Sequence, residues 1–162
     1  MEPRIEERAA RPYAGVTRAV TMTTFDQVAD RIPEIIGWLA GRGAAPAGAP
    51  FLRYHVIDMD RRLEVEAGVP VAAPVEADGA IRPGVLPAGR YLTADHTGHP
   101  DELVQVTAGL LDWAEREGLA FDVADDPEGQ RWGCRLETFL TNPMEVPDPS
   151  KWETQLAFRL AG

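Results

Sequence analysis

Apolar residues recur every three or four positions in two parts of this chain, as they do on the buried face of an amphipathic helix. The spacing predicts helices over residues 24–42 and 100–117. Pro33 lies inside the first of these ranges. Because proline has no amide hydrogen and its ring crowds the preceding turn, we expect a kink or a new helix start near Arg31.

Elsewhere apolar and polar residues alternate, which is the period of a β-strand with one buried face. We predict strands over residues 5–22, 51–57, 62–69, 90–95, 132–140 and 152–160. A turn at 58–60 joins the second and third of these strands. Residues 70–89 are rich in proline and glycine and predict an irregular crossing, and residues 120–130 predict an acidic loop. Two helices with antiparallel strands place the chain in the α+β class.

The two predicted helices end in similar sequences, with Trp38 and Trp113 at corresponding positions. Each helix follows one strand and precedes two. We interpret the chain as a single domain over 1–162, made of duplicated β-α-β-β halves at about 1–75 and 85–162. Such halves would pack about a pseudo-twofold axis, with the helices on the outer face and a ligand cleft between the halves. Chance similarity of two amphipathic helices is the alternative, and we assign both tryptophans to helix packing.

The strand predicted around Glu137 carries a carboxylate among apolar and aromatic neighbours. Alternation puts Cys134 on one face and Arg135, Glu137 and Phe139 on the other. If the Cys134 face packs on the helices, Glu137 faces a cavity. A carboxylate there is unfavourable unless it is paired, hydrogen-bonded or available to a cationic ligand. The alternative is a solvated Glu137 that pairs with Arg135 or Arg159.

The composition is that of a globular protein with an acidic balance. Of its 162 residues, 44% are hydrophobic and 26% charged, which suits one domain with a sizeable core. The formal net charge of −10 opposes phosphate backbones and anionic lipid surfaces, whose binding needs clustered Lys and Arg. We therefore expect no direct nucleic-acid partner and no membrane partner. The same charge favours the approach of cations.

Nothing in the sequence indicates a metal or cofactor. His55, His96 and His99 lack the spacing of a zinc-binding helix. Cys134 is the single cysteine, so the chain forms no internal disulfide, and its place in the strand predicts inert packing against the helices. The N-terminal residues lack a signal-peptide core, and no apolar run has membrane-spanning length. We expect a cytoplasmic protein without a cofactor.

Four short segments together resemble a known family. They lie at residues 50–54, 65–71, 136–139 and 147–154. They are similar to segments of the GyrI-like small-molecule-binding domains, which are also effector domains of MerR-type and AraC-type multidrug-responsive regulators. The resemblance covers most of the chain. It implies the duplicated α+β architecture described above.

The resemblance also implies where a ligand binds. In this family a glutamate on a strand of the second half, followed two residues later by an aromatic residue, faces an aromatic-lined cleft and contacts ligand cations. Glu137 and Phe139 match this pattern. Tyr54, Trp132 and Trp152 lie on or beside predicted strands and are candidate walls of the cleft, although each also suits a core position. The expected function is binding of bulky apolar or cationic small molecules.

Other functions stay open. Some stand-alone members of the family are hydrolases that open cyclopropane rings of DNA-alkylating antibiotics, and Glu137 with Tyr54 would supply the acid and base groups. The family name also suggests a protein-interaction module of the gyrase-inhibitor type. The sequence lacks a helix-turn-helix segment, so a role in transcription regulation would be that of a free-standing sensor. The related haem-binding fold shares the architecture, but no residue here singles out haem.

Overall fold

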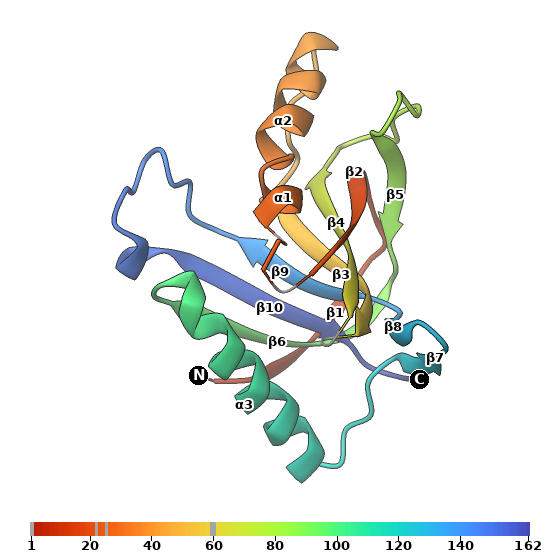
Figure 1. The fold of residues 1–162 in the computed structure, drawn as a ribbon, viewed down its shortest axis with the longest axis vertical. Helices are drawn as coiled ribbons and strands as arrows, with labels where there is room; N and C mark the ends of the chain where they lie inside the picture. Colours follow the sequence, from red (N-terminus) through yellow and green to blue (C-terminus); the bar gives the residue numbers. More distant parts are fainter. Residues whose placement is uncertain (1, 22, 25, 59–60) are drawn as a thin grey trace.

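The computed structural model describes residues 2–21, 23–24, 26–58 and 61–162 (Figure 1). Its strands are β1 (Arg4–Arg8), β2 (Arg11–Val20), β3 (Phe51–Asp58), β4 (Arg62–Pro70), β5 (Arg82–Leu86), β6 (Gly89–Thr97), β7 (Val123–Asp126), β8 (Gly129–Trp132), β9 (Arg135–Phe139) and β10 (Glu153–Arg159). Its helices are α1 (Asp26–Ala29), α2 (Ile32–Gly41) and α3 (Leu103–Arg116), with short 3-10 turns at Pro100–Glu102 and Pro149–Lys151. The α+β class is confirmed.

The strands form one antiparallel sheet in the order β1-β6-β10-β9-β3-β4-β2-β5, and β8 links the β7–β8 hairpin to β3. The order is the same on both sides of the β9–β3 contact: β9, β10, β6 in one direction and β3, β4, β2 in the other. Each of these three-strand sets belongs to one half of the sequence. One helix segment follows the first strand of each half (Figure 1).

The first predicted helix restarts as expected. α1 ends at Ala29 and α2 begins at Ile32, with Pro33 in its first turn, where a missing amide hydrogen leaves no bond unmade. The helix predicted from residue 24 includes Phe25, which lies outside the described residues. The hydroxyl of Thr24 accepts a hydrogen bond from the amide of Thr21.

Both long helices end in the same way. Gly43 and Gly118 adopt left-handed φ angles of 72° and 71°. In each case the residue after the glycine donates its amide hydrogen to a carbonyl of the last helical turn, at 2.9 Å. This is the glycine-terminated end that helices commonly form. It is consistent with a repeat, whereas the equivalence of the two complete halves stays a prediction that superposing residues 10–70 on 85–160 would test.

Several strand boundaries differ from those predicted. The first predicted strand is two strands, because β1 crosses to pair with β6 of the second half. The segment expected to be irregular contains β5, and the expected acidic loop contains β7 and part of β8. These strands are short and largely exposed, so they carry little alternation. The predicted turn at 58–60 includes Met59 and Asp60, which are outside the part of the chain that the structure describes.

The helices cover the opposite face of β9 from the one we predicted. Leu52 and Leu156, which flank Glu137 on the adjoining strands, belong to the main core together with apolar residues of α2 and α3. Cys134 and Leu136 belong to a smaller core on the other face. Alternation determines which side chains share a face, but it does not say which face the helices cover. Cys134 is fully buried, as expected for a packing residue, but not against the helices.

A glycine-to-alanine substitution should have opposite effects on stability at the left-handed end of α2 and in the middle of that helix. Gly43→Ala should lower the free energy of unfolding by about 1 kcal/mol, because a Cβ disfavours the left-handed conformation. Gly37→Ala, in the exposed middle of α2 where nothing lies within 4 Å of an added Cβ, should raise it by up to about 1 kcal/mol. Urea denaturation of the two variants measures both. Equal effects would contradict this account of the helix end.

Candidate functional site

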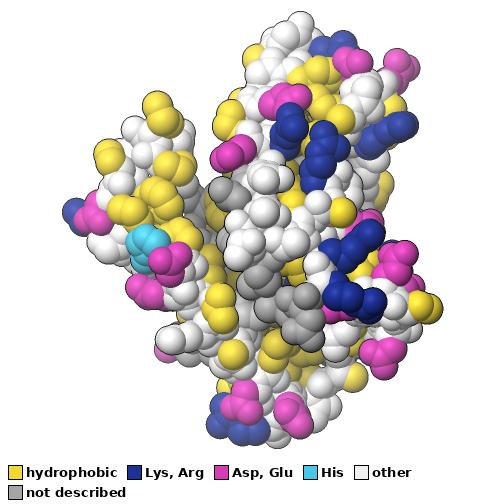
Figure 2. All heavy atoms as spheres, in the orientation of Figure 1, with side chains coloured by type: hydrophobic (Ala, Val, Ile, Leu, Met, Phe, Trp, Pro, Cys, Tyr) yellow, Lys and Arg dark blue, Asp and Glu magenta, His cyan; other side chains and the backbone are white. Residues whose placement is uncertain are grey.

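Glu137 lies in the middle of β9, at the centre of the sheet. Its cross-strand neighbours are Leu52 of β3 and Leu156 of β10, so its side chain projects from the face that carries the helices. Figure 1 places β9 between α2 and α3, and Figure 2, in the same orientation, shows a hollow between these two lobes. The Glu137 side chain is half-buried. A carboxylate thus lies on the helix-covered face of the sheet, among apolar neighbours.

Tyr54 contacts Glu137 directly. The Tyr54 hydroxyl donates a hydrogen bond of 2.7 Å to Oε2 of Glu137. Burial raises the pKa of Glu137, and the bond from Tyr54 and the charge of Arg135 oppose this effect. Burial, and then the charge of Glu137, raise the pKa of Tyr54 well above its usual value. Tyr54 therefore stays protonated at neutral pH and can act as a hydrogen-bond donor.

Arg135 lies two residues before Glu137 on the same face. Its guanidinium carbon is 4.6 Å from the ring centre of Phe158, 4.7 Å from that of Trp132 and 5.9 Å from that of Tyr54. These distances are in the range of cation–π attraction. Burial lowers the pKa of Arg135, while Tyr54 and Glu137 oppose that shift. The aromatic surface near Glu137 is thus occupied by a cation of the protein itself.

The sequence did not indicate this role of Arg135. We expected Arg135 only as an ion-pair partner of a solvated Glu137, and Phe158 was not among the predicted site residues. Alternation placed Arg135 on the face of Glu137, but it does not indicate which rings the guanidinium contacts. Nothing in the local sequence indicates that Phe158, on β10, contributes the nearest ring.

The other aromatic residues predicted to line the ligand site differ in how deeply they are buried. Phe139 is half-buried and packs against the main core on the face of Glu137. Trp132 is 5% exposed and packs at steep ring angles against Phe121 and Phe158, at ring-centre distances of 5.4 and 5.7 Å. Its indole nitrogen has no hydrogen-bond partner among the residues described. Trp132 therefore backs the site from within the core.

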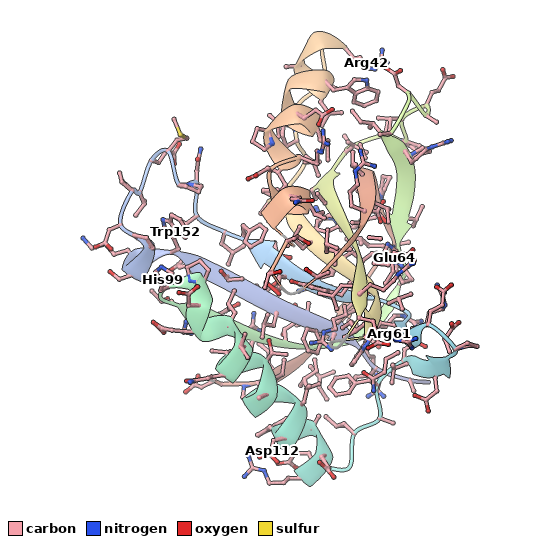
Figure 3. The ribbon with its side chains drawn as sticks, in the orientation of Figure 1. Arg42, Arg61, Glu64, His99, Asp112 and Trp152 are labelled. Carbon is pink, nitrogen blue, oxygen red and sulfur yellow. The ribbon has the colours of Figure 1, made fainter. Side chains whose placement is uncertain are left out.

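Trp152 lies farther out. It is half-buried just before β10, near His99, which precedes the 3-10 turn that leads into α3 (Figure 3). Its indole nitrogen donates to the carbonyl of Val146 at 2.6 Å, and its own carbonyl accepts from the amide of Gly98 at 2.9 Å. The first bond lies within the segment before β10, and the second connects that segment to the residue after β6. Trp152 thus belongs to the lobe that borders the hollow, and the structure does not bring it into contact with Glu137.

A second acidic residue is buried on the other face of the sheet. Glu66 is 6% exposed and accepts hydrogen bonds from the Tyr13 hydroxyl and, at 2.9 Å, from Nε2 of His55 when that nitrogen is protonated. Arg53 donates to the same hydroxyl at 3.1 Å. A Cβ on Gly15 would lie 2.4 Å from a Glu66 oxygen, so glycine is needed there. This carboxylate is held by several protein groups, in contrast to Glu137.

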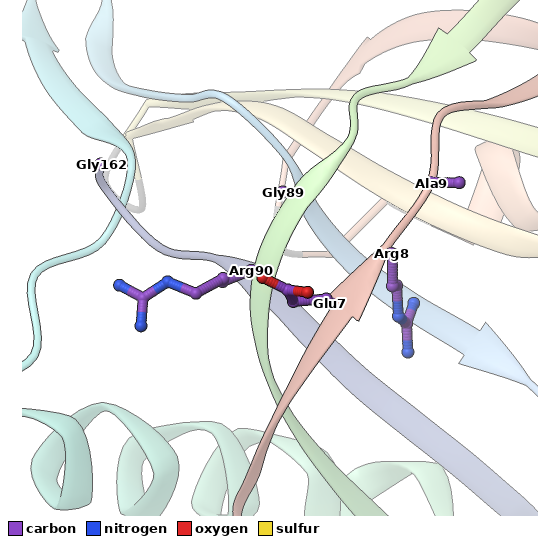
Figure 4. A pocket seen from close by; sticks show the side chains of 6 residues that line it. All are labelled: Glu7, Arg8, Ala9, Gly89, Arg90 and Gly162. Atoms are coloured by element: carbon purple, nitrogen blue, oxygen red, sulfur yellow. The ribbon is translucent and has the colours of Figure 1, made fainter.

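Two pockets lie away from Glu137. One, of about 570 Å³, is shown in Figure 4 and is lined by Glu7, Arg8, Ala9, Gly89, Arg90 and Gly162. It adjoins a second pocket of about 380 Å³, which lies over Phe51 and Leu136 on the opposite face of β9. Neither pocket contains a residue that the sequence predicted for the site. The candidate site is instead Glu137, because a half-buried carboxylate with a single hydrogen-bond donor among the described residues is typical of functional sites.

Within the described ranges, no three His, Cys, Asp or Glu side chains gather in a way that would hold a metal ion. None of the helices in those ranges has the length and apolar character needed to cross a membrane.

Comparison with known proteins identifies the family. The GyrI-like small molecule binding domain matches residues 1–161. The chain belongs to this family. No curated protein matches the sequence. The fold is similar to that of the EcmrR C-terminal domain, with a TM-score of 0.73 at 19% identity, over 99% of this chain and 97% of that one.

Other GyrI-like folds are similar over nearly the whole length. EcmrR in its DNA complex has a TM-score of 0.79 at 19% identity; the match covers 98% of this chain but only 57% of that one. SAV2435 bound to tetraphenylphosphonium has a TM-score of 0.64 at 12% identity, covering 100% and 95%. A hydrolase from Listeria innocua has a TM-score of 0.64 at 14% identity, covering 99% and 92%. At these identities the likeness establishes the fold.

The hydrogen bond between Tyr54 and Glu137 predicts a titration effect. Tyr54→Phe removes a bond that favours the ionised carboxylate, so the pKa of Glu137 should rise further. The carbon-13 resonance of the Glu137 carboxyl group, followed by NMR against pH, measures this. Tyr13→Phe removes a similar bond to Glu66 on the other face and should leave the Glu137 titration unchanged. A pKa that stays constant or falls in Tyr54→Phe would contradict the assignment.

Proposed function

We propose that this GyrI-like chain binds bulky lipophilic cations, with Glu137 as their charge partner. The observation that carries the proposal is the bonding of Glu137: among the described residues it accepts one hydrogen bond, from Tyr54, and forms no direct ion pair. A half-buried carboxylate among apolar neighbours, with acceptor capacity left over, is poorly solvated in the free protein. A weakly hydrated cation can bind beside such a carboxylate, because little of its own hydration is lost on binding.

The aromatic residues on this face supply the second part of the interaction. Tyr54, Phe139 and Trp132 lie on the strands around Glu137, and Trp152 lies in the lobe beside the hollow of Figure 2. A desolvated cation gains roughly 0.5 to 2 kcal/mol from each aromatic face that it contacts. The structure of SAV2435 with tetraphenylphosphonium is consistent with ligands of this kind on the same fold. Affinity should therefore depend on both the charge and the area of the ligand.

The charge requirement can be tested with two ligands of nearly equal shape, methyltriphenylphosphonium and neutral triphenylphosphine oxide. Isothermal titration calorimetry at pH 8 should show that Glu137→Gln weakens binding of the cation about tenfold, or about 1.4 kcal/mol. Binding of the neutral compound should change little. If the cation affinity stays within about twofold, or about 0.4 kcal/mol, Glu137 is not its charge partner.

The affinity for the cation should also depend on pH. Because burial raises the pKa of Glu137, its carboxylate takes up a proton at a higher pH than an exposed glutamate does. Cation affinity should be complete above that raised pKa and should fall as the pH is lowered through it, with the fold retained. Titrations from pH 8 to pH 5 check this for wild type. Glu137→Gln should be insensitive to pH over this range, and equal pH profiles of the two proteins would contradict the proposal.

A hydrolase is the second candidate, and the Tyr54–Glu137 pair favours it. A protonated tyrosine within 2.7 Å of a carboxylate of raised pKa is a plausible acid–base pair. The fold of the Listeria innocua hydrolase is consistent with this role. Incubation with a cyclopropane-containing alkylating compound, followed by mass spectrometry, distinguishes the two functions. Ring opening over several turnovers by wild type, lost in both Glu137→Gln and Tyr54→Phe, would establish the hydrolase. A compound that wild type leaves unchanged would exclude this reaction for the protein.

A further inference from the structure

We propose that Arg135 is a tethered competitor of the ligand: its guanidinium occupies the aromatic surface beside Glu137 and leaves when a ligand cation binds. This inference rests on the proposed function and adds a selection rule to it. A cation site whose aromatic faces are already covered by a cation of the protein accepts only ligands that replace that cation favourably.

The contacts of Arg135 are those of a bound cation. The guanidinium lies within 6 Å of the ring centres of Phe158, Trp132 and Tyr54, all on the helix-covered face of the sheet. Glu137 is close enough to act on the charge of Arg135 without a direct ion pair. Aromatic faces and one carboxylate are the same elements that the proposed function assigns to a lipophilic cation.

Arg135 lacks the polar bonds that hold Arg53 and Arg159, two other half-buried arginines of the sheet. Among the described residues it forms no hydrogen bond and no ion pair. Arg53 donates to the Tyr13 hydroxyl and to two backbone carbonyls, and Arg159 donates to Asp122 at 2.7 Å and to the carbonyl of Ala88. Breaking such bonds would leave buried acceptors unsatisfied. An outward movement of the Arg135 side chain breaks no such hydrogen bond or ion pair. Its cost is therefore limited to the lost contacts with the rings.

Displacement follows from charge. If Arg135 stayed in place, a ligand cation beside Glu137 would share one carboxylate with the guanidinium. The two positive charges would then repel each other where little water screens them. An outward rotation of Arg135 removes this repulsion, returns the guanidinium to water and uncovers the rings of Trp132 and Phe158. Binding is then an exchange of one cation for another.

The exchange selects for ligand area. A small cation offers the rings no more contact than the guanidinium does, so its exchange for Arg135 brings no net gain. A cation with several aryl groups covers the rings and the surrounding apolar surface and gives up little hydration. Arg135 should therefore exclude small cations while permitting large ones. This makes it a specificity-determining residue.

The test compares a large and a small cation, methyltriphenylphosphonium and tetramethylammonium. Binding to the whole chain is measured by calorimetry at pH 8.5, because loss of Arg135 raises the pKa of Glu137 and the carboxylate must remain ionised. Arg135→Met should bind methyltriphenylphosphonium about tenfold more tightly than wild type and should bind tetramethylammonium measurably, whereas wild type should not. Arg135→Lys, whose ammonium is more strongly hydrated, should show a smaller gain.

Arg131→Met is the matched control. It removes one positive charge from an exposed arginine on β8 that pairs with Asp126, away from the rings. Its affinities should equal those of wild type, which separates a local effect from a change in net charge. Circular dichroism confirms that each variant is folded. If Arg135→Met does not fold, Arg135→Lys alone decides the outcome.

The outcomes separate this inference from the proposed function. A loss of cation affinity in Glu137→Gln, without a gain in either Arg135 variant, would overturn the competitor role and leave the cation site in place. Unchanged cation binding in Glu137→Gln would overturn the proposed function itself. A gain of the same size in Arg131→Met would show that net charge, and not the occupied aromatic surface, limits affinity.

Discussion

The pairing of β9 with β3 is the contact on which the fold and the site both depend. It joins the two three-strand sets into one sheet, and its register places Leu52 opposite Glu137. Because residues opposite each other project from the same face, Tyr54 then lies on the side of Glu137 and reaches its carboxylate. A slip of one residue would turn Glu137 to the other face. The site therefore exists only as long as this register holds.

The two faces of the sheet treat a buried carboxylate differently. Glu66 receives bonds from Tyr13 and His55 and is nearly inaccessible, so it acts as a structural acid that stabilises the second core. Glu137 receives one bond, from Tyr54, and stays half-exposed. The difference in bonding is what distinguishes this structural acid from the carboxylate that we propose as a ligand partner.

Much of the architecture could be predicted because it depends on local periodicity. The helical spacing located α2 and α3, Pro33 located the break before α2, and alternation located β3, β4, β6 and β10. The resemblance in four short segments pointed to the GyrI-like family, which the match over residues 1–161 confirms. The short exposed strands β5, β7 and β8 were missed, because backbone pairing with neighbours and not side-chain burial maintains them.

The sequence by itself determined that Glu137, Arg135 and Phe139 share one face of a strand, because side-chain direction alternates along any strand. Only the tertiary structure decided that the helices cover this face, that Tyr54 bonds to Glu137, and that Trp132 and Phe158 hold the Arg135 guanidinium. The physical reason is that these contacts join β3, β8, β9 and β10. Their meeting depends on strand order and register, which result from the packing of the whole chain and are encoded in no single segment.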